Sequence, residues 1–247
     1  YQPQVTLHSQ QVTGVEALVR LPLSPDDPAD ARPIGPAEFI PIMEETGMIS
    51  TLGEWVLTES CRQGKEWLEQ GIEFGRICVN LSPAELRRGG VVERVQRILQ
   101  ESQLPPERLE LELTESGLME SGSGIEQLLH TLHNLGVTLT IDDFGTGYSS
   151  LAYLKRFPVH QIKIDRSFVQ DLPGNENDAQ LVSAMIVMAH GLRLTVVAEG
   201  IEQSDQADYL SQLGCDLVQG YLYSRPLPAH QLRTWLAARH LTLTSHE

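Results

Sequence analysis

The chain has 247 residues, of which 41% are hydrophobic and 21% are charged, a composition typical of soluble globular proteins. Eighteen Lys and Arg residues against 33 Asp and Glu residues give a net charge of −15, which argues against binding of long nucleic acid through a basic surface. No apolar run approaches the roughly 18 residues of a membrane span, and no signal peptide opens the chain.

The chain opens with two strand-like segments. Gln4–Leu7 and Val12–Arg20 flank the polar run His8–Gln11 and predict an antiparallel hairpin. The next segment, Leu21–Pro33, holds four prolines and three aspartates, a pattern typical of an exposed loop. Pro36 suits a first helical turn, and Gly47 suits the position just past the end of that helix.

From residue 76 onward, short β-branched runs alternate with segments whose apolar residues recur every three or four positions, as in a helix with one buried face. The expected strands are Arg76–Leu81, Leu109–Thr114, Val137–Ile141, Gln161–Ile164, Leu194–Ala198 and Cys215–Val218. The expected helices are Val91–Glu101, Ile125–Leu135, Ala179–His190 and Gln203–Leu213. Ser123 and Ser204 stand at the heads of the second and fourth helices, and Gly174–Asp178 is expected to be a loop. This alternation implies crossover helices and a parallel sheet.

Polar residues close five of the apolar runs. They are Glu16 in VEALVR, Asn80 in ICVNLS, Glu112 in LELELTES, Asp142 and Asp143 in LTIDDFGTG, and Glu199 in LTVVAEG. The strands of a (βα)8 barrel carry their chemistry at their carboxyl ends, and such barrels have about 250 residues. We therefore expect an α/β protein with a single (βα)8, TIM-like barrel that begins with an antiparallel strand. Tyr1 is not a natural start, so residues 1–247 are expected to be one domain cut from a longer protein.

The strand ends would bring several carboxylates into one small volume. Two like charges about 4 Å apart repel by roughly 4 kcal/mol at an effective dielectric near 20, so such a cluster needs cations. Oxygen ligands suit magnesium or manganese. Asp142 and Asp143 are consecutive, and consecutive strand residues face opposite ways. Both reach one site where the strand ends, and Gly145 and Gly147 are expected to supply the turn.

Eight motifs, taken in order, resemble the EAL-domain family of bacterial cyclic-di-GMP phosphodiesterases. They are EALVR (16–20), PAEFIPIMEETG (36–47), VNLSP (79–83), ELTES (112–116), DDFGTGYSSL (142–151), KID (163–165), AEGIE (198–202) and QGYLYSRPLP (219–228). The resemblance covers essentially the whole chain. It implies an enzyme that opens one phosphodiester of cyclic di-GMP, giving linear pGpG, with two Mg²⁺ or Mn²⁺ ions, and it implies inhibition by Ca²⁺.

The resemblance also implies roles for single residues. The oxygen ligands of the two-metal site correspond to Glu16, Asn80, Glu112, Asp142 and Asp143, with Asp142 placed to bridge. Paired metals stabilise the attacking and leaving oxygens of an in-line phosphoryl displacement, which explains these residue types.

By the same resemblance, Lys163 contacts the nucleophilic water or a substrate oxygen, and Gln219 supports the water and metal network. Glu199 corresponds to the candidate general base, which acts on that water or holds the second metal through a water. Arg20 corresponds to a phosphate contact, and Leu18 of the same motif is assigned to the substrate.

Glu115 and Glu202 are assigned to loop support. Each follows a candidate functional residue by three positions, and in the family the first of them holds the DDFGTG loop in its working position. That loop, Asp143–Ser150, contains two glycines and is expected to move.

Single residues have plainer explanations. A Glu at a strand end is more often solvated than a ligand, and Asn80 alone is a common turn residue. Arg20 can pair with Asp26 or Asp27, and Glu202 can be a first-turn acid that interacts with a helix dipole. Five clusters at the ends of different strands, in family order, favour the metal site.

Histidine and cysteine offer weaker alternatives. His130 and His133 lie one helical turn apart, but their helix is expected on the outside of the barrel, which disfavours a zinc site. His160 and His190 are expected to be structural. The three cysteines form no CxxC pair, which fits a reducing cytoplasm. Cys78 and Cys215 fall in strand-like runs, which favours buried structural thiols at these two positions.

The chain departs from the family pattern after EALVR. The family continues with a Trp and a His-Pro pair, whereas here Leu21–Ser24 leads into a longer acidic loop. This segment borders the substrate entrance in related proteins, so the departure bears on affinity and base contacts more than on the metal ligands.

Three functions compete. A cyclic-di-GMP phosphodiesterase leads, a non-hydrolytic receptor for the same nucleotide is the alternative, and a silent scaffold is third. Receptors in this family usually lack one or more ligands, and this chain has the full set. Family resemblance further implies a homodimer through helices near the DDFGTG loop, attached regulatory or sensory domains, and no membrane segment within this chain.

Overall fold

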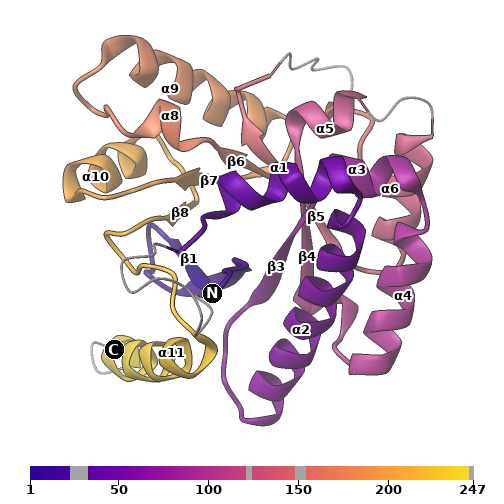
Figure 1. Cartoon of the computed structure of the whole chain (residues 1–247). Coiled ribbons are helices and arrows are strands. Elements are labelled where there is room, and N and C mark those ends of the chain that lie inside the picture. Colours follow the sequence, from indigo (N-terminus) through magenta and orange to yellow (C-terminus); the bar gives the residue numbers. More distant parts are fainter. Residues whose placement is uncertain (23–32, 121–123, 148–153, 245–247) are drawn as a thin grey trace.

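The computed structural model describes residues 1–22, 33–120, 124–147 and 154–244, with side chains described through residue 239. Eight strands, in chain order, close into one barrel, and helices pack around its outside (Figure 1). The strands are β1 (Gln2–Thr6), β2 (Val12–Ala17), β3 (Arg76–Leu81), β4 (Leu109–Thr114), β5 (Thr138–Phe144), β6 (Gln161–Ile164), β7 (Thr195–Glu199) and β8 (Leu217–Gln219).

The helices follow the same alternation. They are α1 (Pro36–Thr46), α2 (Ile49–Glu69), α3 (Pro83–Arg88), α4 (Val91–Ser102), the 3₁₀ turn η1 (Pro106–Arg108), α5 (Glu115–Glu120), α6 (Ile125–Asn134), α8 (Arg166–Val169), α9 (Glu176–Gly191), α10 (Ser204–Gln212) and α11 (Ala229–Thr244).

Strand β1 runs antiparallel to both of its neighbours, β2 and β8, whereas β2 to β8 are parallel. A short turn suffices between antiparallel strands, while parallel strands need a crossover connection. The hairpin at the start of the chain therefore replaces the first crossover helix. The predicted (βα)8 barrel with an antiparallel first strand is confirmed.

Three predicted strands, β3, β4 and β6, have the expected bounds. Strands β5, β7 and β8 begin one or two residues later and end one to three residues later than predicted, β1 begins and ends earlier, and β2 ends at Ala17 rather than Arg20. The sequence patterns missed α2, a helix of 21 residues. Its buried face includes Ser60, Gln63 and Gly64. These residues interrupt the three- and four-residue spacing of apolar residues by which a helix is predicted from sequence.

Two helix starts also differ from expectation. The segment expected as a loop at Gly174–Asp178 contains the start of α9, because the Asn175 side chain accepts hydrogen bonds from the N–H groups of Asn177 and Asp178 and caps the helix. Gln203, rather than Ser204, occupies the cap position of α10. Ser123 lies outside the described residues. Pro36 and Gly47 bound α1 as expected, with Gly47 at a φ of 76°.

The barrel interior is polar, whereas branched apolar residues fill the interior of most barrels of this class. One layer of inward side chains comprises Gln4, Cys78, Glu110, Thr140 and Gln161. Most apolar residues of the strands face the helices instead, whereas Val197 and Leu217 are in register with the inward-facing Lys163. The outward residues form the hydrophobic core; among them are Val15, Ile77, Val79, Leu109, Leu111, Leu139, Ile162, Val196 and Val218. Stability thus comes from the outer layer, which leaves the interior available for polar chemistry.

Candidate metal centre

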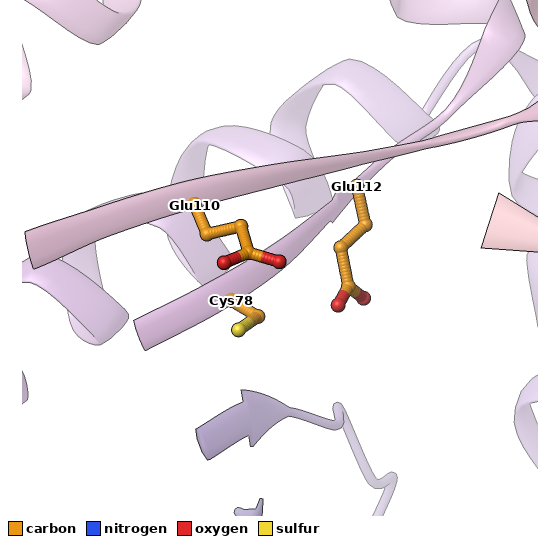
Figure 2. Close-up of side chains that lie close together, drawn as sticks. All are labelled: Cys78, Glu110 and Glu112. Atoms are coloured by element: carbon orange, nitrogen blue, oxygen red, sulfur yellow. The ribbon is translucent and has the colours of Figure 1, made fainter. Parts of the chain in front are cut away.

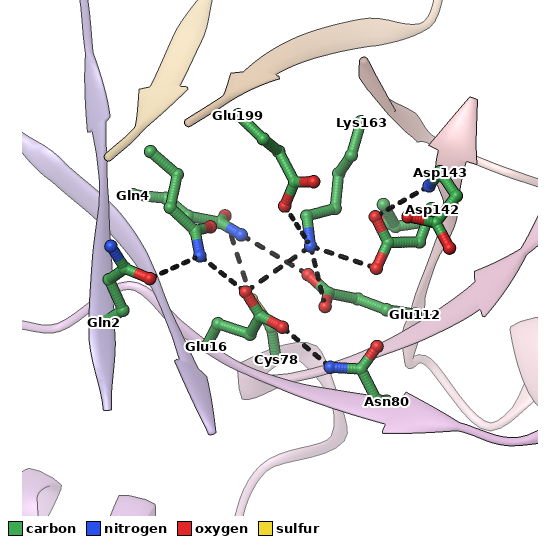
Figure 3. Close-up of polar contacts among 12 residues, drawn as sticks. Gln2, Gln4, Glu16, Cys78, Asn80, Glu112, Asp142, Asp143, Lys163 and Glu199 are labelled. Carbon is green, nitrogen blue, oxygen red and sulfur yellow. Dashed lines mark hydrogen bonds and ion pairs between the residues drawn. The ribbon is translucent and has the colours of Figure 1, made fainter. Parts of the chain in front are cut away.

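Every strand contributes a polar side chain to one end of the barrel, and Figure 3 labels those from β1 to β7. The residues, from β1 to β8, are Gln2, Glu16, Asn80, Glu112, Asp142, Lys163, Glu199 and Gln219. The seven parallel strands present these residues at or near their carboxyl ends. Because β1 is antiparallel, its amino end lies at the same mouth, and this brings Gln2 to the site.

Lys163 lies at the centre of the cluster with 1% of its side chain exposed. Its Nζ is 2.8 Å from Glu199 Oε1, 3.1 Å from Glu112 Oε2 and 3.3 Å from Asp142 Oδ2, and 3.5 Å from Glu16 Oε2. Burial lowers the pKa of an ammonium group, but the surrounding carboxylates, Asp142 first, raise the pKa of Lys163 well above its usual value. The site therefore holds one buried positive charge among several carboxyl groups.

Glu16 is fixed from two sides. Asn80 Nδ2 donates to Glu16 Oε1 at 2.7 Å, and Gln219 Nε2 donates to Glu16 Oε2 at 2.5 Å. Burial works to raise the pKa of Glu16, but the Lys163 ammonium and these two hydrogen bonds outweigh it and lower the pKa overall. Glu16 is thus held as a carboxylate in a fixed orientation.

The other acids are crowded. Burial, followed by the charge of Glu16, raises the pKa of Glu112 well above its usual value. Burial raises the pKa of Glu199 to about 8, against the opposing effect of Lys163. Burial and the charge of Asp142 raise the pKa of Asp143 to about 6. These shifts share one physical cause, an excess of acid groups over cations in a poorly hydrated space, and added cations would relieve it.

The arrangement of oxygens fits two hard cations. One oxygen each from Glu16, Glu112 and Asp142 lie within 4.8 Å of one another, and so do oxygens of Asp142, Asp143 and Glu199. Asp142 belongs to both groups, as a bridging ligand would. Mg²⁺ takes oxygen ligands and usually keeps several water molecules, so each group would hold such an ion with water in the remaining positions.

Gln219 supplies a second indication. Its Nε2 donates to Glu16 and, at 3.3 Å, to Gln2. Its Oε1 is buried and has no hydrogen-bond partner among the described residues. A buried acceptor without a partner is costly, and a bound water in a metal network would satisfy it.

Asp142 and Asp143 reach the same mouth through a break in β5. The pairing of β5 with β6 shifts between Ile141 and Phe144, and Asp143 has a φ of 54°, a left-handed conformation that is uncommon outside glycine. We expected Gly145 and Gly147 to supply this turn. Gly145 does have a positive φ, of 99°, but the reversal already begins at Asp143, and Gly147 is not among the positive-φ residues.

The two residues assigned to loop support have different partners. Glu115 Oε2 accepts the backbone N–H of Gly145 at 2.9 Å, the contact expected of a residue that holds the DDFGTG loop. Residues 148–150 of that loop lie outside the described residues. Glu202 instead pairs with Arg166, at 2.9 Å from Nη2 to Oε1, so its role in loop support stays a prediction.

The two residues assigned to the substrate lie beside the cluster. Leu18 lines both a cavity of about 280 Å³ that contains Glu16, Asp142, Glu199 and Gln219 and a neighbouring cavity of about 390 Å³. Arg20 lines the second cavity and is exposed, with Nη1 donating to its neighbour Val19 O at 2.8 Å. Asp26 and Asp27, the other partners considered for Arg20, lie outside the described residues.

Sequence reasoning missed the polar layer below the site. Glu110 accepts Thr140 Oγ1 at 2.7 Å and Gln161 Nε2 at 2.9 Å, and it lies 3.7 Å from Arg76. Figure 2 shows Glu110 and Glu112 on one strand with Cys78 beside them. Alternation in LELELT was the available signal, since residues two apart on a strand share a face. The partners of Glu110 indicate a structural role. Cys78 and Cys215 are buried free thiols, as expected, and Cys61 is a third.

Comparison with known proteins gives a consistent result. Residues 1–226 match the family model of the EAL domain. Over 232 residues the chain is 44% identical to the bifunctional diguanylate cyclase/cyclic di-GMP phosphodiesterase MucR of Pseudomonas aeruginosa, a match of 94% of this chain and 33% of that protein. It is 44% identical to the cyclic di-GMP phosphodiesterase NbdA of the same organism, covering 96% of this chain and 30% of NbdA.

The solved structures agree. A structure of the PaMucR phosphodiesterase in complex with c-di-GMP has a TM-score of 0.88 and 44% identity, covering 94% of this chain and 92% of that one. The chain spans about a third of the length of the curated relatives that it matches. Within the described residues, no helix is both long and apolar enough to cross a membrane.

Proposed function

Because the chain belongs to the EAL-domain family, we propose that it is a phosphodiesterase that hydrolyses one phosphodiester of cyclic di-GMP to give linear pGpG. The observation that carries the proposal is the pair of oxygen clusters that share Asp142, together with the contacts of Lys163 with Asp142 and with Glu199, a member of the second cluster. The relatives named as cyclic di-GMP phosphodiesterases support the same substrate.

We propose two Mg²⁺ or Mn²⁺ ions as cofactors. The residues that would hold them are Glu16, Asn80, Glu112, Asp142 and Asp143. When bound, such ions activate a water molecule and stabilise the charge on the attacking and leaving oxygens. Asn80 already positions Glu16 through its Nδ2, so its own oxygen is the atom left to coordinate.

Glu199 is proposed to accept the proton of the attacking water. Its side chain lines the cavity at the mouth and its Oε1 contacts Lys163 Nζ at 2.8 Å. The ammonium fixes the direction of the carboxylate and favours the hydroxide that forms. Gln219, through its unpartnered Oε1, is proposed to hold a water of the same network.

Arg20 and Leu18 are proposed to bind the substrate. The guanidinium group of Arg20 stands at the edge of the neighbouring cavity, and its planar fork matches two phosphate oxygens. Leu18 separates the two cavities and offers an apolar contact to a base or ribose.

The context of the domain is also proposed. The relatives are about three times longer than this chain, so we propose that attached regulatory or sensory domains control the site. We propose that this domain lies in the cytoplasm, in a parent protein that is either free or anchored to a membrane. We also propose a homodimer through helices near the DDFGTG loop.

Single-turnover hydrolysis of cyclic di-GMP tests the proposal. With Mg²⁺ or Mn²⁺ we expect linear pGpG, and with Ca²⁺ we expect nucleotide binding without turnover, because Ca²⁺ accepts longer and more flexible coordination. Nucleotide binding without product in Mg²⁺ and Mn²⁺ would identify a receptor instead. No binding under any of these conditions would reject both functions.

A further inference from the structure

The turn that follows β7 carries Glu199 and is packed against Arg166. Gly200, the next residue, has a φ of 73°, and a Cβ at this position would collide with the Cβ, Cγ and Cδ atoms of Arg166. The aliphatic stem of Arg166 therefore lies directly on the backbone of Gly200. Because Gly200 has no side chain to separate its backbone from Arg166, a shift of the arginine would shift the turn after β7 as well.

The head of Arg166 holds the same turn at its far end. Its Nη2 lies 2.9 Å from Glu202 Oε1. Arg166 is the first residue of α8 and follows Lys163 by three positions. Lys163 Nζ contacts Glu199. The end of β6 and the start of α8 thus contact the turn after β7 at two points. Lys163 contacts Glu199 at the start of the turn, and Arg166 contacts Glu202 at its end.

The other side of the turn is fixed by β8. The N–H of Ile201 donates to Gln219 O at 3.2 Å, and the N–H of Leu222 donates to Ile201 O at 3.0 Å. A Cβ at Gly220 would collide with the Ile201 backbone, so these segments are in close contact. Arg166 supplies the opposing support from the side of β6.

Arg166, Glu199, Gly200 and Glu202 also line the same cavity as Asp142. The ion pair itself is exposed, with 55% of the Arg166 side chain and 43% of the Glu202 side chain accessible. Exposed pairs add little to folding stability. We therefore expect the Arg166–Glu202 pair to orient the turn after β7 rather than to add to the free energy of unfolding.

We infer that Arg166 is a positioning residue, which holds the Glu199 carboxylate beside the oxygens of Asp142 and Asp143. It does so by clamping residues 199–202, with its aliphatic stem on Gly200 and its guanidinium group on Glu202. This inference rests on the proposed function of Glu199. It assigns Glu202 to the same clamp rather than to the DDFGTG loop.

The kinetic test uses Arg166→Ala and Arg166→Lys. Arg166→Ala should lower kcat by about tenfold to a hundredfold, because a small displacement of a catalytic group has effects of that size, while KM changes less than about twofold. Arg166→Lys retains a stem and a cation and should restore most of kcat. Arg97→Ala is the matched control, since Arg97 is also an exposed arginine, paired with Glu54 and Glu101. A raised KM with unchanged kcat would make Arg166 a substrate anchor and overturn the inference.

A second readout needs no activity. In the metal-free protein, hydrogen exchange of the amides at residues 200–203 should be about tenfold faster in Arg166→Ala than in the wild type, because local opening controls exchange. Arg97→Ala should leave these amides unchanged. Unchanged exchange in Arg166→Ala would overturn the clamp even in an active enzyme. If the wild type hydrolyses no cyclic di-GMP, the proposed function fails, and exchange alone decides whether the clamp exists.

Discussion

Asp143 donates its backbone N–H to the Oδ1 of Asp142 at 2.9 Å, and its left-handed φ of 54° allows two consecutive carboxylates of one strand to serve one mouth. This contact fixes Asp142 while leaving its Oδ2 beside Lys163. Asp142 is also the residue shared by the two oxygen clusters. Both proposed metal positions therefore depend on this one side chain.

Asp142→Asn should therefore abolish turnover and leave nucleotide binding, because the bridging charge is lost while Arg20 and the cavity walls remain. We expect less than about a tenth of the wild-type rate, since a metal supplies several kcal/mol of transition-state stabilisation. Single-turnover kinetics and calorimetric nucleotide titration provide the measurements. Asp208→Asn, an exposed residue of α10, is the control and should match the wild type. A rate above a tenth would contradict the shared-ligand geometry.

Glu199→Gln should lower kcat more than it weakens substrate binding. The amide keeps the size of the side chain and its hydrogen bonding, but it cannot accept the proton of an attacking water. Steady-state kinetics with excess Mg²⁺ measure the split between kcat and KM. A higher KM with an unchanged kcat would recast Glu199 as a substrate anchor.

Lys163→Met should destabilise the metal-free protein by about 3–5 kcal/mol, the usual cost of removing one partner from a buried ion network. Methionine nearly preserves the volume of the side chain, so the loss reports on charge. Urea unfolding of the metal-free protein measures this loss, and kcat should fall as well. Equal unfolding midpoints for the variant and the wild type would contradict this prediction. They would show that the four surrounding carboxyl groups do not need the Lys163 ammonium to offset their mutual repulsion.

Glu115→Ala should act through the backbone of the DDFGTG loop. Removal of the acceptor leaves the N–H of Gly145 without its 2.9 Å partner. The Asp143 carboxylate should then be held less firmly, and the metal ion that it ligates should bind more weakly. We expect a higher Mg²⁺ concentration at half-maximal rate and little change in the free energy of unfolding. Glu115→Gln keeps an acceptor and should lie closer to the wild type. Identical Mg²⁺ titration curves for all three proteins would remove Glu115 from the mechanism.

The sequence by itself determined the architecture and most of the candidate ligands. Period-two and period-3.6 patterns are local properties, so β3, β4 and β6 could be placed to the residue. Placing Glu16, Glu112 and Asp142 at the mouth required one further rule, that parallel strands in a barrel end at the same face. The order of motifs added the resemblance that implied their roles.

Tertiary structure alone decided how these side chains meet. The antiparallel direction of β1 brings Gln2 to the mouth, closure of the barrel buries Lys163 among four carboxylates, and the stem of Arg166 lies on Gly200. Such contacts join residues far apart in the chain, and their distances depend on strand register, barrel closure and the left-handed turn at Asp143. Local periodicity carries no information about these quantities, because it fixes which face a residue occupies and not which side chain it meets there.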